Sequence, residues 1–155
     1  MTDNLVNLVI NSYKEINFVQ KADKIFRFTD LNNRLTAFEK ERILSCFKNL
    51  GYVFKMKSTK EFVNKQSIGM VEFTMSFNVN NGVILPYLYV YSNGERVPYD
   101  YPSFVFTYKY LKGDFETSME PATVYTNYEE FEIIVKEVID VYMEFRNVFL
   151  AKLNH

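Results

Sequence analysis

The chain of 155 residues has few of the residue types from which catalytic and metal centres are most often built. It has no tryptophan, one cysteine, Cys46, and one histidine, the C-terminal His155. A single cysteine cannot form a disulfide within the chain, which favours a reducing compartment over secretion. One histidine and one cysteine do not supply the ligands of a structural zinc site, so we expect no bound metal. A nucleophile–histidine pair would depend on the terminal His155, a position that is usually frayed.

Glycine is also scarce, with five residues in all, and the motifs that bind phosphates or dinucleotides through glycine-rich loops are absent. Cys46 falls late in a predicted helix and beside apolar residues, so we expect a buried, unreactive thiol. Catalysis by carboxylates alone would require two acidic side chains to converge in a pocket. We therefore expect a protein without enzymatic activity and without a cofactor.

No apolar run approaches the roughly 18 residues of a membrane span. Residues 1–11 contain Asp3 and no basic residue, which does not fit a signal peptide. Hydrophobic residues make up 48% of the chain and charged residues 24%, values that are ordinary for a globular domain. We expect a single domain over residues 1–155, located in the cytoplasm and not bound to a membrane.

The net charge of −1 hides a division of charge along the chain. Residues 14–65 contain twelve basic and six acidic residues, whereas residues 113–145 contain nine acidic residues and only one basic residue, Lys136. Two solvated surfaces would account for this division, and so would a surface that attracts a partner of opposite charge.

Helical patterns occur at both ends of the chain. Near the N-terminus, apolar residues recur at helical spacing after possible N-caps at residues 2–4; they are Val6, Val9, Ile10, Tyr13 and Ile16. Residues 18–28 fit a helix or a strand. Thr36 and Glu39 form a capping-box pattern that predicts a helix ending at Gly51, where a left-handed residue belongs.

The last helix has the clearest pattern. It begins with a capping box of Thr126 and Glu129, or of Asn127 and Glu130 one residue later. Its predicted core stripe comprises Phe131, Ile134, Val135, Val138, Tyr142, Phe145 and Phe149, which fall within a sector of about 100°. The opposite face is acidic, and Ile133 falls within it.

Between these helices the apolar period changes from 3.6 to 2. Strands are predicted at residues 53–57, 71–79, 83–92 and 103–111. Asn81-Gly82 and Asn93-Gly94 predict tight hairpin turns, and Pro86 predicts a sheet edge or a bulge. The fold class is therefore α+β: an antiparallel meander of three to five strands, with N-terminal helices and a long C-terminal helix packed on it.

Tyrosines are the most unusual part of the predicted sheet, because Tyr87, Tyr89 and Tyr91 share one strand face. Tyrosine is enriched at protein interfaces and on surfaces that stack bases. Base stacking also needs neighbouring cations, and between residues 71 and 109 only Arg96 and Lys109 are basic. We therefore expect no nucleic-acid partner.

A small apolar ligand is the alternative use of these rings. It would require a cavity of a few hundred Å³ beneath Tyr87, Tyr89 and Phe106, whereas a filled core would dismiss it.

In its small size, acidic patch, aromatic content and lack of catalytic residues, the chain resembles bacterial immunity proteins of contact-dependent growth-inhibition and related polymorphic toxin systems. This resemblance implies a cognate toxin domain, often a basic nuclease, that is blocked in a stoichiometric complex. The predicted partner-binding surface combines acidic residues, one exposed apolar residue and two tyrosines: Asp114, Glu116, Glu120, Glu129, Glu132, Ile133, Glu137, Asp140, Tyr99 and Tyr101.

Overall fold

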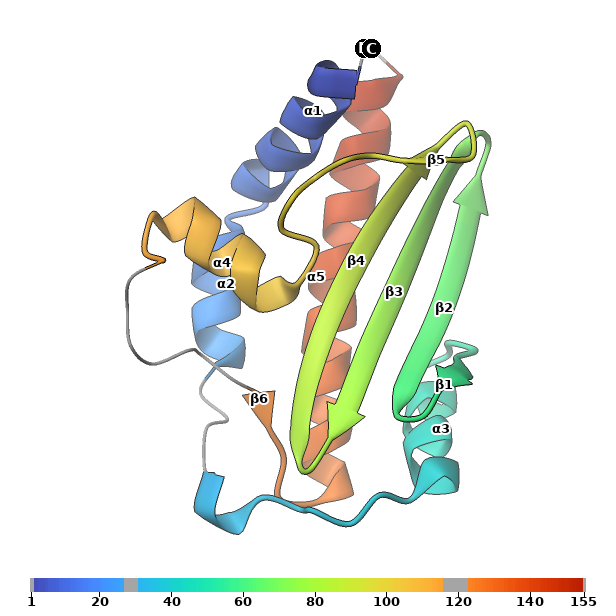
Figure 1. Cartoon of the computed structure of the whole chain (residues 1–155), viewed down its shortest axis with the longest axis vertical. Helices are drawn as coiled ribbons and strands as arrows, with labels where there is room; N and C mark the ends of the chain where they lie inside the picture. Colours follow the sequence, from blue (N-terminus) through green and yellow to red (C-terminus); the bar gives the residue numbers. More distant parts are fainter. Residues whose placement is uncertain (1, 27–30, 116–122, 155) are drawn as a thin grey trace.

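The longest element is the C-terminal helix α5 (Tyr128–Leu153), around which the other elements pack (Figure 1). The computed structural model describes residues 2–26, 31–115 and 123–154. The other helices are α1 (Thr2–Glu15), α2 (Phe18–Ile25), the short 3-10 helix η1 (Leu31–Asn33), α3 (Lys40–Asn49) and α4 (Phe104–Lys112). The strands are β1 (Lys55–Ser58), β2 (Glu61–Ile68), β3 (Val71–Asn80), β4 (Val83–Ser92), β5 (Glu95–Arg96) and β6 (Thr123–Val124). The predicted α+β fold is confirmed.

All strands are antiparallel, and β1 to β5 follow one another as a meander. β6 joins from a distance and pairs with the beginning of β4, whereas β5 pairs with its end. β4 is fully paired with β3 on one edge. On its other edge, between β6 and β5, the described residues form one isolated bridge, from Tyr87 to Ser103. Pro86 therefore lies at an incompletely paired edge of the sheet, as its missing N–H predicted.

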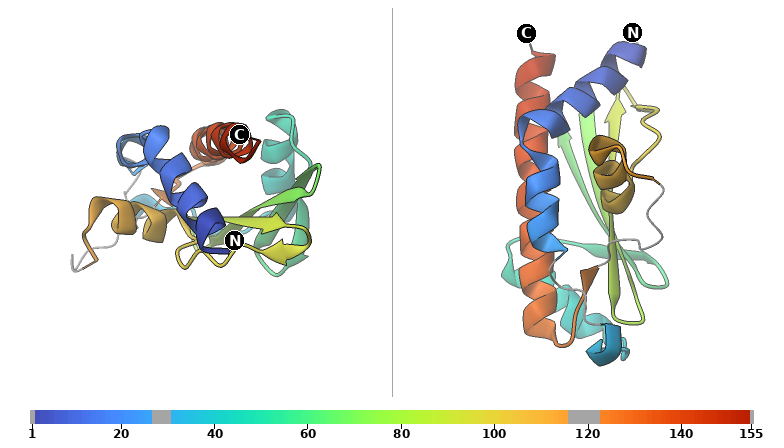
Figure 2. Two further views of the ribbon diagram at one scale, coloured as in Figure 1. Left: turned by 90° about the horizontal axis from the view of Figure 1, so that it is seen from above. Right: turned by 90° about the vertical axis from the view of Figure 1, so that its left-hand side faces the viewer.

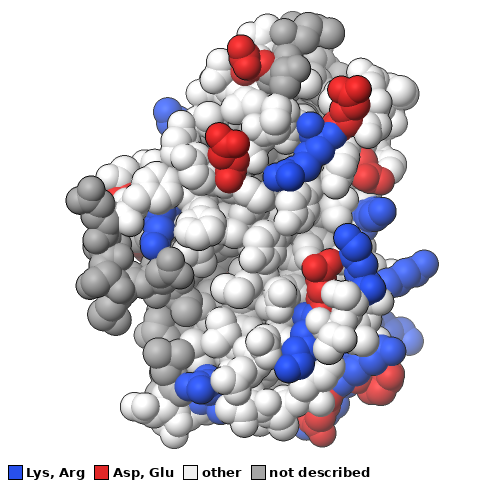
Figure 3. All heavy atoms as spheres, viewed as in Figure 1, with Lys and Arg blue, Asp and Glu red and all other residues white. Residues whose placement is uncertain are grey.

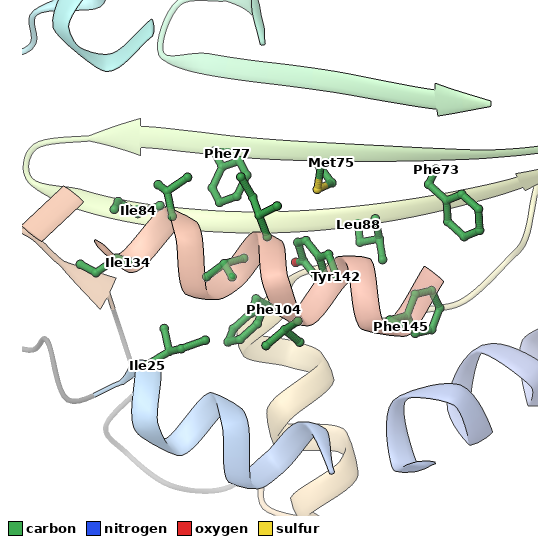
Figure 4. Packing of buried hydrophobic residues seen from close by; sticks show 14 of the residues in the cluster. Ile25, Phe73, Met75, Phe77, Ile84, Leu88, Phe104, Ile134, Tyr142 and Phe145 are labelled. Atoms are coloured by element: carbon green, nitrogen blue, oxygen red, sulfur yellow. The ribbon is translucent and has the colours of Figure 1, made fainter. Parts of the chain in front are cut away.

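The core lies on both sides of α5. Every residue of the predicted core stripe of this helix is buried. On one side the stripe meets alternate side chains of the sheet, including Phe73, Met75 and Phe77 from β3, and on the other it meets Phe104 of α4 (Figure 4). Seen from the side, α5 and the N-terminal helices form one layer behind the sheet (Figure 2).

The second capping-box alternative for α5 is the correct one. Asn127 is the N-cap, and its Oδ1 accepts a hydrogen bond of 2.8 Å from the backbone N–H of Glu130. The carboxylate of Glu130 in turn accepts a bond of 3.0 Å from the N–H of Thr126. One unpaired amide of the first turn, that of Glu130, is thus satisfied, and the returning bond reaches the residue before the N-cap.

The helix predicted after Thr36 is present but shorter at its start. α3 begins at Lys40, and its N-cap Glu39 makes no side-chain capping bond, so the capping box of Thr36 and Glu39 does not form. Gly51 has φ +87°, which confirms the predicted left-handed residue after the helix. Of the ambiguous segment 18–28, residues 18–25 form the helix α2, and residues 27 and 28 lie outside the described residues.

The strand predicted at residues 103–111 is wrong, because this segment forms α4. Ser103 caps the helix by accepting a bond of 3.0 Å from the N–H of Phe106, and Gly113 ends it at φ +74°. Six of the nine positions of the segment are apolar or aromatic, and they fit both the strand and the helix period, so the pattern did not distinguish the two structures. Packing against α2 and α5 selects the helix, which buries Phe104 and Tyr108 and leaves Phe106 44% exposed.

β2 had no counterpart among the predicted strands. Phe62 is its only fully buried side chain, and the other residues of the strand are polar or partly exposed. It is held instead by backbone pairing along its whole length with β3, from Glu61 opposite Asn78 to Ile68 opposite Val71. A strand stabilised in this way carries little hydrophobic pattern in its own sequence.

The β3–β4 turn brings Gly82 into close contact with the segment before α3. Gly82 has φ +79°, and a Cβ placed there would lie 2.7 Å from Cβ of Arg34 and 2.9 Å from the carbonyl oxygen of Leu35. Gly94, in the next turn, has φ +82° but no atom within 4 Å of the same position. The two glycines thus share a backbone conformation and differ in surroundings.

We predict that Gly82→Ala lowers the free energy of unfolding by about 3 kcal/mol, through left-handed strain and the clash with Arg34 and Leu35. Gly94→Ala is the matched control and is expected to cost about 1–2 kcal/mol from strain alone. Urea denaturation followed by circular dichroism measures both. Equal losses for the two variants would contradict the close approach at Gly82.

Candidate functional site

The exposed face of α5 is a narrow ridge that ends with Asn147 and Ala151. We call its charged part, made of Glu129, Ile133, Lys136, Asp140 and Glu144, the α5 ridge. Ile133 is 46% exposed and lies among these charged side chains, as the helical projection predicted. Glu132 and Glu137 flank the ridge and are half-buried. An apolar side chain surrounded by carboxylates is therefore available to a partner at this surface.

Two lysines offset part of the charge of the α5 ridge. Lys136 Nζ lies 2.7 Å from Oδ2 of Asp140 one turn away. Lys21 of α2 lies 2.8 Å from Oε1 of Glu144. Both pairs are largely exposed, so each contributes at most about 1 kcal/mol to stability. Glu129 and Glu132 have no ion pair within the part of the chain that the structure describes.

A hollow of about 440 Å³ separates the start of α5 from α3, next to the α5 ridge. Its lining includes Arg42 and Ser45 on α3 and Tyr128, Glu129 and Glu132 on α5. The Arg42 guanidinium lies 4.3 Å from the centre of the Tyr128 ring. With Glu41 of α3, the hollow thus offers three carboxylates, the Arg42 cation and an aromatic ring next to the α5 ridge.

The remaining acidic residues of the predicted surface do not join the α5 ridge within the described structure. Asp114 follows the end of α4 that points away from α5 (Figures 1 and 2). Glu116 and Glu120 lie outside the described residues. The predicted surface is therefore reduced to its α5 portion: Glu129, Glu132, Ile133, Glu137 and Asp140.

Tyr99 and Tyr101, the two predicted tyrosine anchors, are less exposed than anchors on a surface loop would be. Tyr99 is only 7% exposed, and its hydroxyl lies 3.0 Å from Oγ1 of Thr107. Tyr101 is half-buried and stacks on Tyr110 at 4.6 Å between ring centres. Tyr99 belongs to the core and is unsuited to anchor a partner, while Tyr101 presents only part of its ring.

The outer face of the sheet carries a second candidate site, a groove of about 370 Å³. Its floor is formed by β3, and side chains of β4 and β2 form its two walls. The lining residues are Lys57, Glu61, Val63, Lys65, Thr74, Ser76, Asn78, Tyr87, Tyr89 and Tyr91. We call it the outer-sheet groove.

Cross-strand pairing explains how distant residues meet in the outer-sheet groove. Thr74 lies between Lys65 on β2 and Tyr89 on β4, and in the next row Ser76 lies between Val63 and Tyr87. Residues opposite one another in antiparallel strands share a face of the sheet. The groove therefore combines hydroxyl groups, tyrosine rings and cations from four strands.

Sequence reasoning identified the tyrosines of this groove but missed its lysines. Lys57 and Lys65 come from β1 and the unpredicted β2, and both lie before residues 71–109, the stretch that contains the tyrosines. The alternating pattern of residues 71–80 places Thr74 and Ser76 on the polar face of the strand, and in the structure both are buried. Such burial requires tall neighbours on both sides, but only the pairing reveals which residues they are.

The interior has little room beneath the tyrosine face. A hollow lined by Tyr13, Leu88, Tyr89 and Val97, among others, measures about 10 Å³, far below the few hundred Å³ needed by a small ligand. Phe106, expected beside these rings, projects to solvent from α4. An apolar ligand enclosed beneath Tyr89 is therefore not supported.

Within residues 2–26, 31–115 and 123–154, no cluster of three or more His, Cys, Asp or Glu residues could hold a metal ion. The described helices include none that is long and apolar enough to cross a membrane. No family model, curated protein or solved structure matches the chain.

Cys46 is buried, as predicted, at the wall of the hollow between α3 and α5. Burial raises the pKa of its thiol to about 11; the nearby Glu132 carboxylate adds to the rise, and Arg42 opposes it. Since the thiolate is the reactive form, this environment suppresses nucleophilic chemistry.

We predict that Cys46 in the folded protein reacts with iodoacetamide at pH 8 about a hundredfold more slowly than in urea, because its thiolate fraction is that much smaller. The pH dependence separates this effect from simple shielding. The rate in the folded protein should keep rising about tenfold per pH unit up to pH 9.5, whereas in urea it should level off near pH 9. A folded-state rate that levels off at the same pH would contradict the raised pKa.

Proposed function

We propose that this chain is a non-enzymatic protein that binds a basic protein domain through the α5 ridge and blocks it in a stoichiometric complex. The partner class that fits best is the toxin domain of a bacterial polymorphic toxin system, and the chain would act as its immunity protein in the cytoplasm. The observation that carries the proposal is Ile133, an exposed apolar side chain at the centre of a carboxylate surface.

Charge and burial would have separate roles at such a surface. The carboxylates of Glu129, Glu132 and Asp140 would steer a basic partner and raise its association rate. Ile133 would supply apolar area that is removed from water in the complex, which slows dissociation. The neighbouring hollow between α3 and α5 would accept a basic side chain of the partner, since Glu129 and Glu132 line it.

The gene neighbourhood of the chain gives the first test. A toxin gene immediately upstream should encode a domain that arrests growth when expressed alone and is harmless when co-expressed with this chain. Calorimetry on the two purified proteins should then show a one-to-one complex. Failure of that domain to bind this chain would refute the proposal.

We predict that Glu132→Lys with Asp140→Lys slows association with that domain about tenfold at low salt and reduces the salt dependence of the rate. The control is Glu95→Lys with Asp100→Lys, which changes the charge equally at exposed positions outside the α5 ridge and should leave the rate nearly unchanged. Ile133→Ser should accelerate dissociation about fivefold or more. Stopped-flow and surface plasmon resonance measure these rates. Equal rates for wild type and the Glu132→Lys, Asp140→Lys variant would show that the α5 ridge is not the interface.

A further inference from the structure

We propose that the outer-sheet groove is a second binding site, independent of the α5 ridge, and that it holds single-stranded nucleic acid. The bases would lie against the rings of Tyr87 and Tyr89, and the phosphates would lie beside Lys57 and Lys65. Proteins that bind single strands without strong sequence preference combine these two features, a cationic groove and aromatic faces on which bases stack.

The depth of the groove is the first support. Thr74 and Ser76 are only 8% and 5% exposed, although no described helix crosses this face of the sheet in Figure 1. They are covered by the taller side chains of the neighbouring strands, which stand along both sides of β3. The resulting volume of about 370 Å³ falls in the range of small-ligand sites.

The second support is the charge along one wall. Lys65 has no ion pair with any described residue, and Lys57 has only a long contact of 3.9 Å with Glu61. Lys55 shares the row of Val63 and Ser76, so its Cβ is on the same face. Lys and Arg gather over β1 and β2 along the right-hand margin of the space-filling view (Figure 3). This wall therefore suits a chain of phosphates.

The third support is the arrangement of the rings on the opposite wall. Tyr87 and Tyr89 are parallel to within 1°, with 6.2 Å between their centres. The Arg96 guanidinium lies 4.9 Å from the centre of the Tyr89 ring and adds a flat cation to the row. Tyrosine and arginine both stack on nucleobases, and such contacts tolerate any base.

The floor of the groove carries an unmet hydrogen-bonding group. Oγ1 of Thr74 is buried and has no partner in the described part of the chain. A buried hydroxyl without a partner costs free energy, and a polar atom of a ligand or a water molecule can supply the missing bond. A nucleobase edge or a sugar hydroxyl provides such an atom when the overlying Lys65 side chain moves aside.

The floor also favours nucleic acid over an acidic peptide. β3 is paired along its length with β2 on one side and β4 on the other. An extended peptide lying on this face would therefore find no backbone N–H or C=O groups with which to add a strand. The expectation that the chain has no nucleic-acid partner rested on missing cations beside the tyrosines, and β1 and β2 supply those cations.

Fluorescence anisotropy of a labelled twelve-nucleotide single strand, titrated with the full chain at low salt, tests the proposal. We expect a dissociation constant of about 10 µM that weakens as salt is added. Lys65→Gln should weaken binding and reduce the slope of log K against log salt by about 0.7, because one phosphate contact is lost. Tyr89→Leu, which keeps an apolar side chain but removes the flat ring, should weaken binding about fivefold or more.

Matched controls separate the groove from general effects. Lys48→Gln removes the same charge from an exposed position on α3, and Tyr110→Leu removes a half-buried ring from α4; neither should alter binding. Glu132→Lys with Asp140→Lys changes the α5 ridge only, so its effects on the toxin complex and on the oligonucleotide distinguish the two proposals. Circular dichroism melts confirm that each variant is folded.

The absence of an anisotropy change up to about 100 µM protein would overturn the proposal. Equal weakening by Lys48→Gln and Lys65→Gln would also overturn it, because the contact would then be a diffuse charge effect. Competition by poly-glutamate or by a free mononucleotide as strongly as by the unlabelled strand would assign the groove to a different ligand.

Discussion

The burial of one face of α5 is the constraint on which the rest of the structure depends. Its apolar stripe is wide enough to contact the sheet on one side and Phe104 of α4 on the other (Figure 4). α1 and α2 occupy one flank of the helix and α3 the other, so that, among the described residues, the exposed part of α5 is the α5 ridge and its continuation at Asn147 and Ala151. The described helices therefore cover the inner face of the sheet, and none of them crosses its outer face (Figure 1). Both candidate sites are consequences of this single packing arrangement.

Elements whose structure is determined locally were predictable from the sequence. α5, β3 and β4 each have a long, consistent apolar period, and the two Asn-Gly pairs adopt the positive φ angles that hairpin turns need. α4 was not predictable, because its apolar and aromatic residues, six of the nine positions from 103 to 111, fit both periods. β2 was not predictable for the opposite reason: it has almost no apolar pattern and is defined by its pairing with β3. Tertiary contacts decided both segments.

The failure to predict α4 and β2 also explains why the candidate sites were only partly predictable. Ile133 and its carboxylates lie on one helix, so a helical projection was enough to place them. The outer-sheet groove required the register of four strands, because residues 57–65 meet residues 74–91 only through pairing. Tyr99 was misplaced because Thr107, which meets its hydroxyl, belongs to α4. Because residues 103–111 were predicted as a strand and not as α4, Tyr99 in the preceding loop was predicted to be exposed.

The net charge of −1 does not describe either surface. The α5 ridge and the outer-sheet groove lie on opposite sides of the layers formed by α5 and the sheet (Figure 2). The path between them through solvent is longer than the Debye length of about 8 Å at physiological salt, so a charged partner interacts mainly with the surface that it approaches. A basic domain approaching the α5 ridge would therefore meet mainly carboxylates, and a polyanion approaching the outer-sheet groove would meet mainly Lys57, Lys65 and Arg96. The separation of charge along the sequence is only partly kept in the fold: Lys57 and Lys65 lie on the face away from α5, whereas Lys21 and Arg42 lie beside the α5 ridge.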